Sequence, residues 1–360
     1  MSRSITGKLI DVANALIGRI KGSLALVTVV ASGLFGAISG SGVATASAIG
    51  GLTIPAMKKE GYPAPFAVAV SSISSILGPI IPPSITLIVY ASITNVSVSK
   101  LFIGSVIPGL LLVVCLMGYA LVYAKRNNLP AHEKMPAKEV AKTFKSSIWA
   151  LLMPIIIIGG VMGGIFTATE AGAVACVYGL IVSVFVYKSM SFKDLINVLR
   201  SASVNMAMVM MIIGFSSIFS YIFALEGMGQ KIVDFMLSIT TSPTGLFFLV
   251  IAFMVVIGCF MESLAALPII LPIIYPMFAS LGVNLNQLGV VFALSTVLGG
   301  LTPPVGIYLF LSMNLTGSKM RDTVLPHMLI VIGIMLLVIV LCILLPIPQF
   351  LPDLVFGAAT

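Results

Sequence analysis

The segment Leu77-Gly78-Pro79-Ile80-Ile81-Pro82-Pro83-Ser84 interrupts an apolar run, residues 64–94, that is long enough to cross a membrane. Two consecutive prolines remove two backbone N–H donors, so a regular helix cannot continue through them. A similar break, Gly299-Gly300-Leu301-Thr302-Pro303-Pro304, interrupts residues 287–315. The sequence therefore predicts two broken transmembrane helices.

Each predicted broken helix follows a pair of apolar segments that are individually short for a membrane span. The pairs occupy residues 23–57 and 243–280, and they turn at residues 36–42 and 258–263. Because a full span needs about 20 apolar residues, we interpret each pair as a re-entrant helical hairpin that enters and leaves the membrane on one face.

The two blocks are related by a nearly constant offset. Gly36 precedes Gly258 by 222 positions, and the pair Pro82-Pro83 precedes Pro303-Pro304 by 221. The pairs Pro55/Pro276 and Gly61/Gly282 are also 221 positions apart. Gly and Pro are common in membrane helices, but four landmarks in register to within one residue favour an internal repeat, which is typical of transporter binding sites.

Composition excludes most classes of soluble protein. Of the 360 residues, 59% are hydrophobic and 8% charged, and the mean hydropathy is +1.19. Such a chain cannot build a water-facing surface, so the net charge of +8 does not indicate nucleic-acid binding. The four cysteines stand singly in apolar segments without metal or redox spacing, and we interpret them as core residues.

These patterns predict an all-α polytopic membrane protein with two inverted repeats. The clear full-length spans are residues 101–124, 147–165, 168–188, 201–225 and 324–346. The predicted organisation is a first inverted repeat at 1–124, a basic cytoplasmic loop at 125–146, scaffold helices at 147–225, a second inverted repeat at 226–346, and a C-terminal tail at 347–360.

The distribution of basic residues sets the predicted topology. With the Lys- and Arg-rich loop 125–146 in the cytoplasm, 17 of the 19 basic residues, including Arg3, Lys134 and Lys319, lie on that side. Lys100 and Lys231 lie outside. The first hairpin then enters from the cytoplasm and the second from the periplasm, so the two repeats are inverted, as alternating access requires.

The breaks and hairpin tips are candidate cation sites. Where a helix breaks inside the membrane, its carbonyls lose their donors, and a bound cation can satisfy them. Hard cations prefer oxygen ligands. We therefore predict one Na⁺ site at Gly78, Ile81 and Pro82 with Ser39 and Ser41, and a second at Gly299 and Thr302 with the Met261 carbonyl and Ser263. The alternative is that these Ser and Thr residues only pack helices, as small polar residues do in membranes.

Substrate charge must be recognised without mid-membrane Lys or Arg, because the predicted topology places none there. Helix N-termini after the tips and breaks carry partial positive charge and can attract a carboxylate. The candidate substrate residues are Ser41, Thr45, Ser84, Glu262, Ser263, Thr302 and Asn314.

Two acidic residues admit more than one interpretation. Glu262 is the acid at a hairpin tip and is a functional candidate because it is intramembrane; alternatively it caps the helix 264–280. Glu170 follows Thr167 with capping-box spacing, which favours a structural role at a helix start.

The chain resembles the large membrane subunit of tripartite ATP-independent periplasmic (TRAP) transporters along nearly its whole length. The residues that carry the resemblance lie around both tips and both breaks: 34–41, 44–55, 61–62, 77–84, 101–109, 166–171, 258–272 and 300–306. Family members normally have roughly sixty to seventy further N-terminal residues, so we expect this sequence to be truncated or to start late. Ala168 stands in place of a usual Pro, and Asn286 where Asp is common.

The resemblance implies a secondary transporter of elevator type in the bacterial inner membrane. It would import a small organic acid, such as a dicarboxylate, a sugar acid or a similar carboxylate, driven by Na⁺. A periplasmic substrate-binding protein would deliver the substrate, and a small four-helix membrane subunit would pair with this one in the lipid bilayer. No nucleic acid is expected as a partner.

Three other classes of protein are alternatives to a secondary transporter. An ion or solute channel also uses broken helices, and a non-transporting or truncated membrane subunit would share the sequence features. An intramembrane enzyme is disfavoured: Ser39-Gly40-Ser41-Gly42 looks nucleophile-like, but both histidines lie at predicted membrane edges and no His-Glu-x-x-His motif is present. The sequence therefore predicts no catalytic residues.

Overall fold

The computed structural model describes residues 4–131, 135–315, 321 and 327–357, and every regular element in these ranges is helical. This agrees with the predicted all-α class. Arg3, Lys134 and Lys319, which the topology prediction counts, and residues 324–326 of the last predicted span lie outside the described residues.

The helices group into two compact units, and each unit takes residues from both halves of the chain. Unit 1 comprises Met1–Ser84, Gly109–Ser191 and Ile307–Ile334, and unit 2 comprises Ile85–Pro108, Phe192–Gly306 and Met335–Thr360. The long helix α7 (Val98–Arg126) and the helix α17 (Leu329–Leu344) contribute residues to both.

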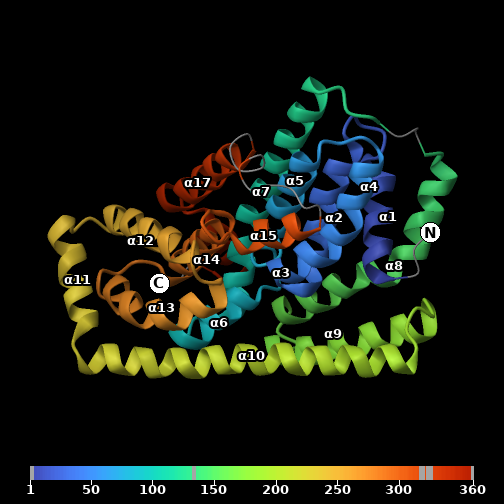
Figure 1. Cartoon of the computed structure of the whole chain (residues 1–360). Coiled ribbons are helices and arrows are strands. Elements are labelled where there is room, and N and C mark those ends of the chain that lie inside the picture. The colour runs from blue at the N-terminus through green and yellow to red at the C-terminus, as the bar shows by residue number, and fades with distance from the viewer. Residues whose placement is uncertain (1–3, 132–134, 316–320, 322–326, 358–360) are drawn as a thin grey trace. The chain divides into compact units, whose positions relative to one another are not determined.

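Unit 1 is built around the first hairpin. One arm is α2 (Ser23–Ser39), and the other runs through α3 (Gly42–Thr45), a π-helical turn η1 (Ala46–Gly50) and α4 (Gly51–Lys59). The first helix, α1 (Ile5–Ile17), packs beside α2, as Figure 1 shows. Burial of Ala13, Val27, Ala31 and Ile49 in one apolar cluster joins α1 to both arms.

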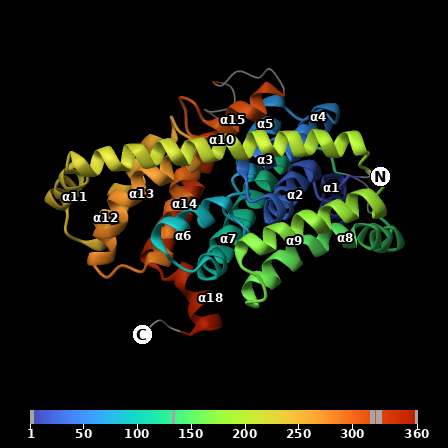
Figure 2. The same ribbon diagram turned by 90° about the horizontal axis from the view of Figure 1, so that it is seen from below.

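Three further parts of unit 1 surround or extend this hairpin. The helix α5 (Ala64–Ser75) packs against α2 and α4, and α15 (Ile307–Asn314) packs against α5 and η1. The helices α8 (Ala137–Met162) and α9 (Ala168–Ile181), the latter followed by η2 (Val182–Val186), lie side by side in Figure 2.

Unit 2 is built around the second hairpin, which comprises α12 (Pro243–Gly258) and α13 (Ser263–Ser280). The helix α14 (Leu285–Leu301) packs along α12, while α6 (Ile85–Thr94) packs against α13 and α14. The long helix α10 (Phe192–Leu225) lies against α13, and α11 (Met228–Ile239) connects it to the hairpin at a steep angle (Figure 1). The helix α18 (Ile347–Phe356) contacts α14.

The two predicted broken helices are exchanged between the units. Of the first, α5 belongs to unit 1 and α6 to unit 2; of the second, α14 belongs to unit 2 and α15 to unit 1. Each unit thus contains one hairpin, the first half of the broken helix that follows it, and the second half of the other broken helix. The contacts α2–α5 and α15–α5 in unit 1 have counterparts α12–α14 and α6–α14 in unit 2.

Three predicted boundaries are corrected by the structure. The helix α8 begins at Ala137, so the second part of the predicted loop 125–146 is helical, and α10 begins at Phe192 rather than at 201. The predicted tail 347–360 contains the helix α18. The hydropathy pattern locates only the apolar part of a helix, whereas Lys and Glu near its start are also good helix formers and extend it into water.

By length and composition, five described helices can cross a membrane: α7, α8, α9 with η2, α10 and α13. A sixth span is formed if α17 and α18, which are bent by 52° at their junction, are taken together. The chain is therefore a multi-pass membrane protein.

Candidate functional site

The tip of the first hairpin is a two-residue turn between α2 and α3. Gly40 adopts a left-handed conformation with φ +62°, and its N–H donates to the Gly36 carbonyl (2.9 Å). Ser41 is extended and caps α3, since its side chain accepts a hydrogen bond from the Ala44 N–H (3.3 Å). A left-handed residue followed by a Ser cap explains why the sequence Ser-Gly-Ser reverses the chain here.

Two glycines allow this tip to touch the first helix break. An added β-carbon on Gly36 would lie 2.9 Å from the Gly78 Cα. An added β-carbon on Gly78 would lie 2.6 Å from the Ser41 carbonyl oxygen and 2.8 Å from Thr45 Oγ1. Only residues without a side chain leave space for this approach.

Oxygen atoms gather at the contact between the tip and Gly78. Thr45 Oγ1 donates to the Ser41 carbonyl (2.7 Å) and lies 3.4 Å from Ser39 Oγ, and Thr45 is fully buried. Ser39 Oγ also donates to the Ser41 carbonyl (3.5 Å). We refer to Ser39, Ser41, Thr45 and Gly78 as the first oxygen cluster. It contains four of the residues predicted to bind Na⁺ or substrate.

The Pro-Pro break removes the helical donors of two carbonyls. In a continuous helix, the N–H groups of Pro82 and Pro83 would donate to the carbonyls of Gly78 and Pro79, but proline has no N–H. Ser84, fully buried, replaces one of them, because its hydroxyl donates to the Pro79 carbonyl (2.5 Å). No donor within the described ranges reaches the Gly78 carbonyl.

No hydrogen bond among the described residues joins Ile81, Pro82 or Asn314 to the first oxygen cluster. The Ile81 N–H donates to the Leu77 carbonyl (2.8 Å), and its side chain lies beside Gly33 and Gly109. Pro82 is buried within the break. Asn314 is the last residue of α15 and is exposed. The helix α15 instead brings Tyr308 to the tip.

Tyr308 is a tip residue that the sequence reasoning missed. An added β-carbon on Gly42 would lie 2.5 Å from Tyr308 Cε1, so the buried Tyr308 ring covers the start of α3. Tyr308 follows the second Pro-Pro break, far from the first hairpin in sequence. The signal was the glycine at position 42, which allows a ring to lie directly on the backbone.

The second tip and break show the equivalent glycine contact. An added β-carbon on Gly258 would lie 2.8 Å from the Gly299 Cα, and the Val305 N–H donates to the Cys259 carbonyl (3.3 Å). Thr302 closes the end of α14: its N–H donates to the Gly299 carbonyl (2.9 Å) and its hydroxyl to Leu298 (2.8 Å).

The other residues predicted for the second Na⁺ site are less completely assembled. Ser263 is buried at the first position of α13, and Met261 lies in the turn before it, where its N–H donates to Ile257 (3.0 Å). No contact recorded for the described residues joins either of them to Gly299 or Thr302. The structure thus brings together Ser39, Ser41 and Gly78 of the first predicted Na⁺ site, and Gly299 and Thr302 of the second.

The two acidic candidates differ in their surroundings. Glu170 forms the predicted capping box: its carboxylate accepts from the Thr167 N–H (2.8 Å), and its own N–H donates to Thr167 Oγ1 (3.2 Å). Glu262 occupies the N-cap position of α13, where its carbonyl accepts from Ala265 and Ala266, but its side chain makes no capping hydrogen bond. The Glu262 carboxylate nevertheless faces the Leu264 N–H in the first turn of α13, so both the capping and the functional interpretation of Glu262 stay open.

A known protein family matches nearly the whole chain. The family model described as "Tripartite ATP-independent periplasmic transporter, DctM component" matches residues 1–347. The chain belongs to the DctM family.

Several relatives of this DctM chain cover most of it. It is 36% identical over 337 residues to the C4-dicarboxylate TRAP transporter large permease protein DctM of Pseudomonas aeruginosa, covering 93% of this chain and 79% of the relative. It is 34% identical over 359 residues to the ectoine/5-hydroxyectoine TRAP transporter large permease protein UehC of Ruegeria pomeroyi, covering 98% and 82%.

This chain matches only about half the length of a third relative. The isethionate TRAP transporter permease protein DctMQ of Oleidesulfovibrio alaskensis is 35% identical over 340 residues, covering 92% of this chain and 53% of the relative. The DctM family comprises transporter permease subunits, so this chain is a permease subunit and not an enzyme.

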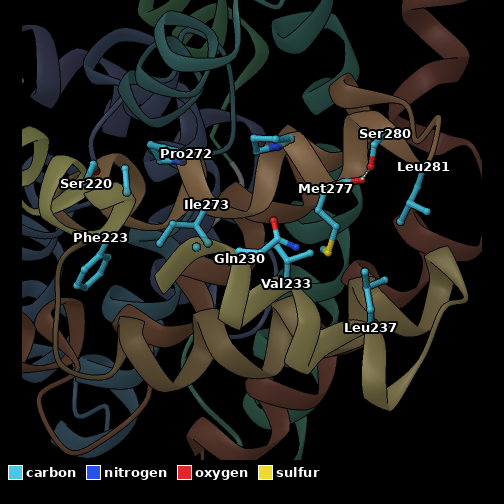
Figure 3. A pocket seen from close by; sticks show the side chains of 13 residues that line it. Ser220, Phe223, Gln230, Val233, Leu237, Pro272, Ile273, Met277, Ser280 and Leu281 are labelled. Atoms are coloured by element: carbon cyan, nitrogen blue, oxygen red, sulfur yellow. Dashed lines mark hydrogen bonds between the residues drawn. The ribbon is translucent and has the colours of Figure 1, made fainter. Parts of the chain in front are cut away.

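A cavity in unit 2 of this DctM permease contains none of the predicted site residues. It has a volume of about 540 Å³ and lies between α10, α11 and α13 (Figure 3). Phe223, Val233 and Met277 give it mainly apolar walls, and the amide of Gln230 donates to the Asp234 carboxylate (2.8 Å). The side-chain oxygens in this lining come from Ser220, Gln230 and Ser280.

Proposed function

We propose that this chain is the transport subunit of a Na⁺-coupled importer of a small organic acid in the bacterial inner membrane. Membership of the DctM family supports the transport role. The first oxygen cluster supports the choice of coupling ion. The two observations are independent, because the family match does not depend on where individual oxygens lie.

The observation that carries the proposal is the packing of the hairpin tip against Gly78, a residue whose carbonyl has no donor in the described part of the chain. The Ser41 carbonyl, Ser39 Oγ and Thr45 Oγ1 lie together against Gly78, whose carbonyl no described donor reaches. Leaving a carbonyl unpaired inside a membrane costs several kcal/mol, and a hard cation can offset that cost. These residues would hold Na⁺, which supplies positive charge for a carboxylate.

The equivalent contacts Gly36–Gly78 and Gly258–Gly299 support an inverted repeat and, with it, an elevator form of alternating access. Under this equivalence Gly299, Thr302, Met261 and Ser263 would hold a second Na⁺. Glycine-lined contacts let the hairpin tip and the break approach and separate without a side chain between them.

The organic-acid class rests on the family. The printed names of the relatives specify C4-dicarboxylate, ectoine and isethionate, so the family varies in what it carries. We propose a small four-helix membrane subunit and a periplasmic substrate-binding protein as the partners of this chain, as in TRAP transporters generally. We propose Ser84, Glu262 and Asn314 as further substrate residues.

The test compares two buried threonines that have the same local hydrogen bond. Thr45 donates to the Ser41 carbonyl (2.7 Å) and Thr53 to the Ile49 carbonyl (2.9 Å), each four residues back. Thr45→Val removes an oxygen of the cluster, whereas Thr53→Val is the matched control. We expect NaCl, compared with KCl at equal ionic strength, to raise the Tm of purified wild type and of Thr53→Val but not of Thr45→Val.

Reconstitution with the small subunit and the binding protein completes the test. Uptake of acids from a carboxylate panel should require an inward Na⁺ gradient, saturate, and show counterflow, and Thr45→Val should lower it at least tenfold. The same Na⁺ response in both variants would remove Thr45 from the ion site. Flux that neither saturates nor shows counterflow would indicate a channel, and uptake without Na⁺ would overturn the proposed coupling.

A further inference from the structure

A groove in unit 1, separate from the hairpin tips, runs between α7 and α17. It has a volume of about 290 Å³. Ile330 and Ile334 form its side on α17, and Gly118, Val122 and Arg126 form part of its side on α7. Their spacings of four residues place each set on one helix face. The groove therefore follows the helix axis and ends at Arg126, the last residue of α7.

The wall of the groove is apolar and open to its surroundings. Val122 and Ile330 each keep 53% of their surface exposed. An added β-carbon on Gly118 would meet no atom within 4 Å, so the absence of a side chain there leaves the groove open at one end. In a membrane protein, an exposed apolar surface of this kind faces acyl chains.

Aromatic residues fix the inner side of the groove. Tyr119 Oη and His327 Nδ1 are 2.8 Å apart and share a hydrogen bond. The Tyr123 ring stacks on Phe66 with 3.9 Å between ring centroids. Tyr119 and Tyr123 both line the groove, so its shape is set by buried contacts rather than by mobile side chains.

The end of the groove is positively charged. Arg126 forms no ion pair with any carboxylate among the described residues, and Tyr123, one helical turn before it, has a hydroxyl without a described hydrogen-bond partner. Arg126 ends an apolar span of 29 residues, which is where phosphate headgroups lie. A guanidinium and a phenol on one helix face offer several N–H and O–H donors to a phosphate.

We propose that this groove binds one anionic phospholipid of the surrounding bilayer. Its acyl chain lies along Val122, Ile330 and Ile334, and its phosphate is held by Arg126 with Tyr123. The apolar length of the groove favours a lipid over a soluble phosphate, because a free anion would leave that surface without a partner. A guanidinium without a carboxylate partner in the described part of the chain favours an anionic headgroup over a zwitterionic one.

The test measures binding of phosphatidylglycerol and of phosphatidylcholine with the same acyl chains to the purified chain in neutral detergent. Titration of Tm against lipid gives an apparent Kd. We expect phosphatidylglycerol to bind more tightly, and Arg126→Gln to weaken it roughly tenfold, as expected for loss of one charged hydrogen-bonding partner. Lys125→Gln is the matched control, because Lys125 is adjacent and basic but does not line the groove.

A second variant tests the apolar part of the groove. Gly118→Leu places a side chain in the open space without removing any charge, and we expect it to weaken binding of phosphatidylglycerol while Tm in lipid-free detergent is unchanged. Native mass spectrometry of wild type and Arg126→Gln gives an independent readout, since wild type should retain one more phosphatidylglycerol. Arg126 is exposed, so this comparison does not depend on refolding the core.

Three results would overturn the assignment. Equal binding of the two lipids would show that the headgroup charge is not recognised. Equal losses in Arg126→Gln and Lys125→Gln would indicate general attraction of basic residues for anionic lipid. A similar rise of Tm with glycerol phosphate alone would assign the groove to a soluble anion instead.

Discussion

Gly36 of α2 packs against Gly78 so closely that a β-carbon on Gly36 would lie 2.9 Å from the Gly78 Cα. The same contact recurs between Gly258 and Gly299, where the corresponding distance is 2.8 Å. Gly36 precedes Gly258 by 222 positions, and Gly78 precedes Gly299 by 221, which is also the offset between the two Pro-Pro pairs. Each pair joins a hairpin to the helix break that follows it, so tip and break are held at backbone contact in both halves of the chain.

This contact predicts that Gly78 tolerates no side chain. In Gly78→Ala the new methyl group would meet the Ser41 carbonyl at 2.6 Å and Thr45 Oγ1 at 2.8 Å. We expect a loss of about 1–3 kcal/mol in the free energy of unfolding, together with loss of the Na⁺-dependent rise in Tm. Gly51→Ala is the control, because a β-carbon on Gly51 meets nothing within 4 Å. The measurement is the Tm of both variants in NaCl and in KCl. Equal Tm values for Gly78→Ala and Gly51→Ala would contradict the close contact.

Ser84 is predicted to stabilise the first break. In Ser84→Ala the Pro79 carbonyl loses its donor, and Pro83 has no N–H to replace it, so we expect a cost of about 1–3 kcal/mol. Ser72→Ala is the comparison: Ser72 is equally buried and donates to the Val68 carbonyl (2.8 Å), which keeps its helical partner. Equilibrium unfolding in detergent should show a clearly smaller loss for Ser72→Ala. Similar losses would mean that the break does not depend on the Ser84 hydroxyl.

A hydrogen bond between α10 and α13 also replaces a donor that a proline removes. Pro272 cannot donate to the Pro268 carbonyl within α13, and Ser220 Oγ of α10 donates to it instead (2.9 Å). Ser220 also lines the cavity of Figure 3. Interhelical hydrogen bonds in membranes contribute about 0.6–2 kcal/mol, so Ser220→Ala should lower Tm measurably. Ser217→Ala, which removes only a bond to Ile213 within α10, should not. An unchanged Tm in Ser220→Ala would show that the carbonyl finds another donor.

Sequence patterns located the tips, the breaks and the capping box, because these depend on residue types with strong backbone preferences. Consecutive prolines end a helix wherever they occur, and Thr167 with Glu170 forms a local cap. They could not reveal that Tyr308 covers Gly42, since that contact joins residues from the two halves of the chain.

The capping box predicts that Glu170 has a structural role and no role in transport. Glu170→Ala should destabilise the first turn of α9, because the Thr167 N–H loses its acceptor there. We expect hydrogen exchange to accelerate in the first turn of α9, while Na⁺-dependent uptake by reconstituted protein is retained. Thr167→Ala should give the same local pattern. Loss of uptake in Glu170→Ala with unchanged exchange would assign Glu170 a role in transport instead.

Thr302 tests whether the second half of the chain repeats the ion site as well as the glycine contact, which there is Gly258–Gly299. Its hydroxyl donates to the Leu298 carbonyl (2.8 Å), which leaves its oxygen lone pairs free to contact a cation. Both Thr302→Val and Thr302→Ser change the packing at the end of α14, but only Ser keeps the oxygen. We therefore expect Thr302→Ser to retain the Na⁺-dependent rise in Tm and Thr302→Val to lose part of it. If Thr302→Val instead lowered Tm equally in NaCl and KCl, Thr302 would serve only to close the helix, and the coupling ion would be confined to the first oxygen cluster.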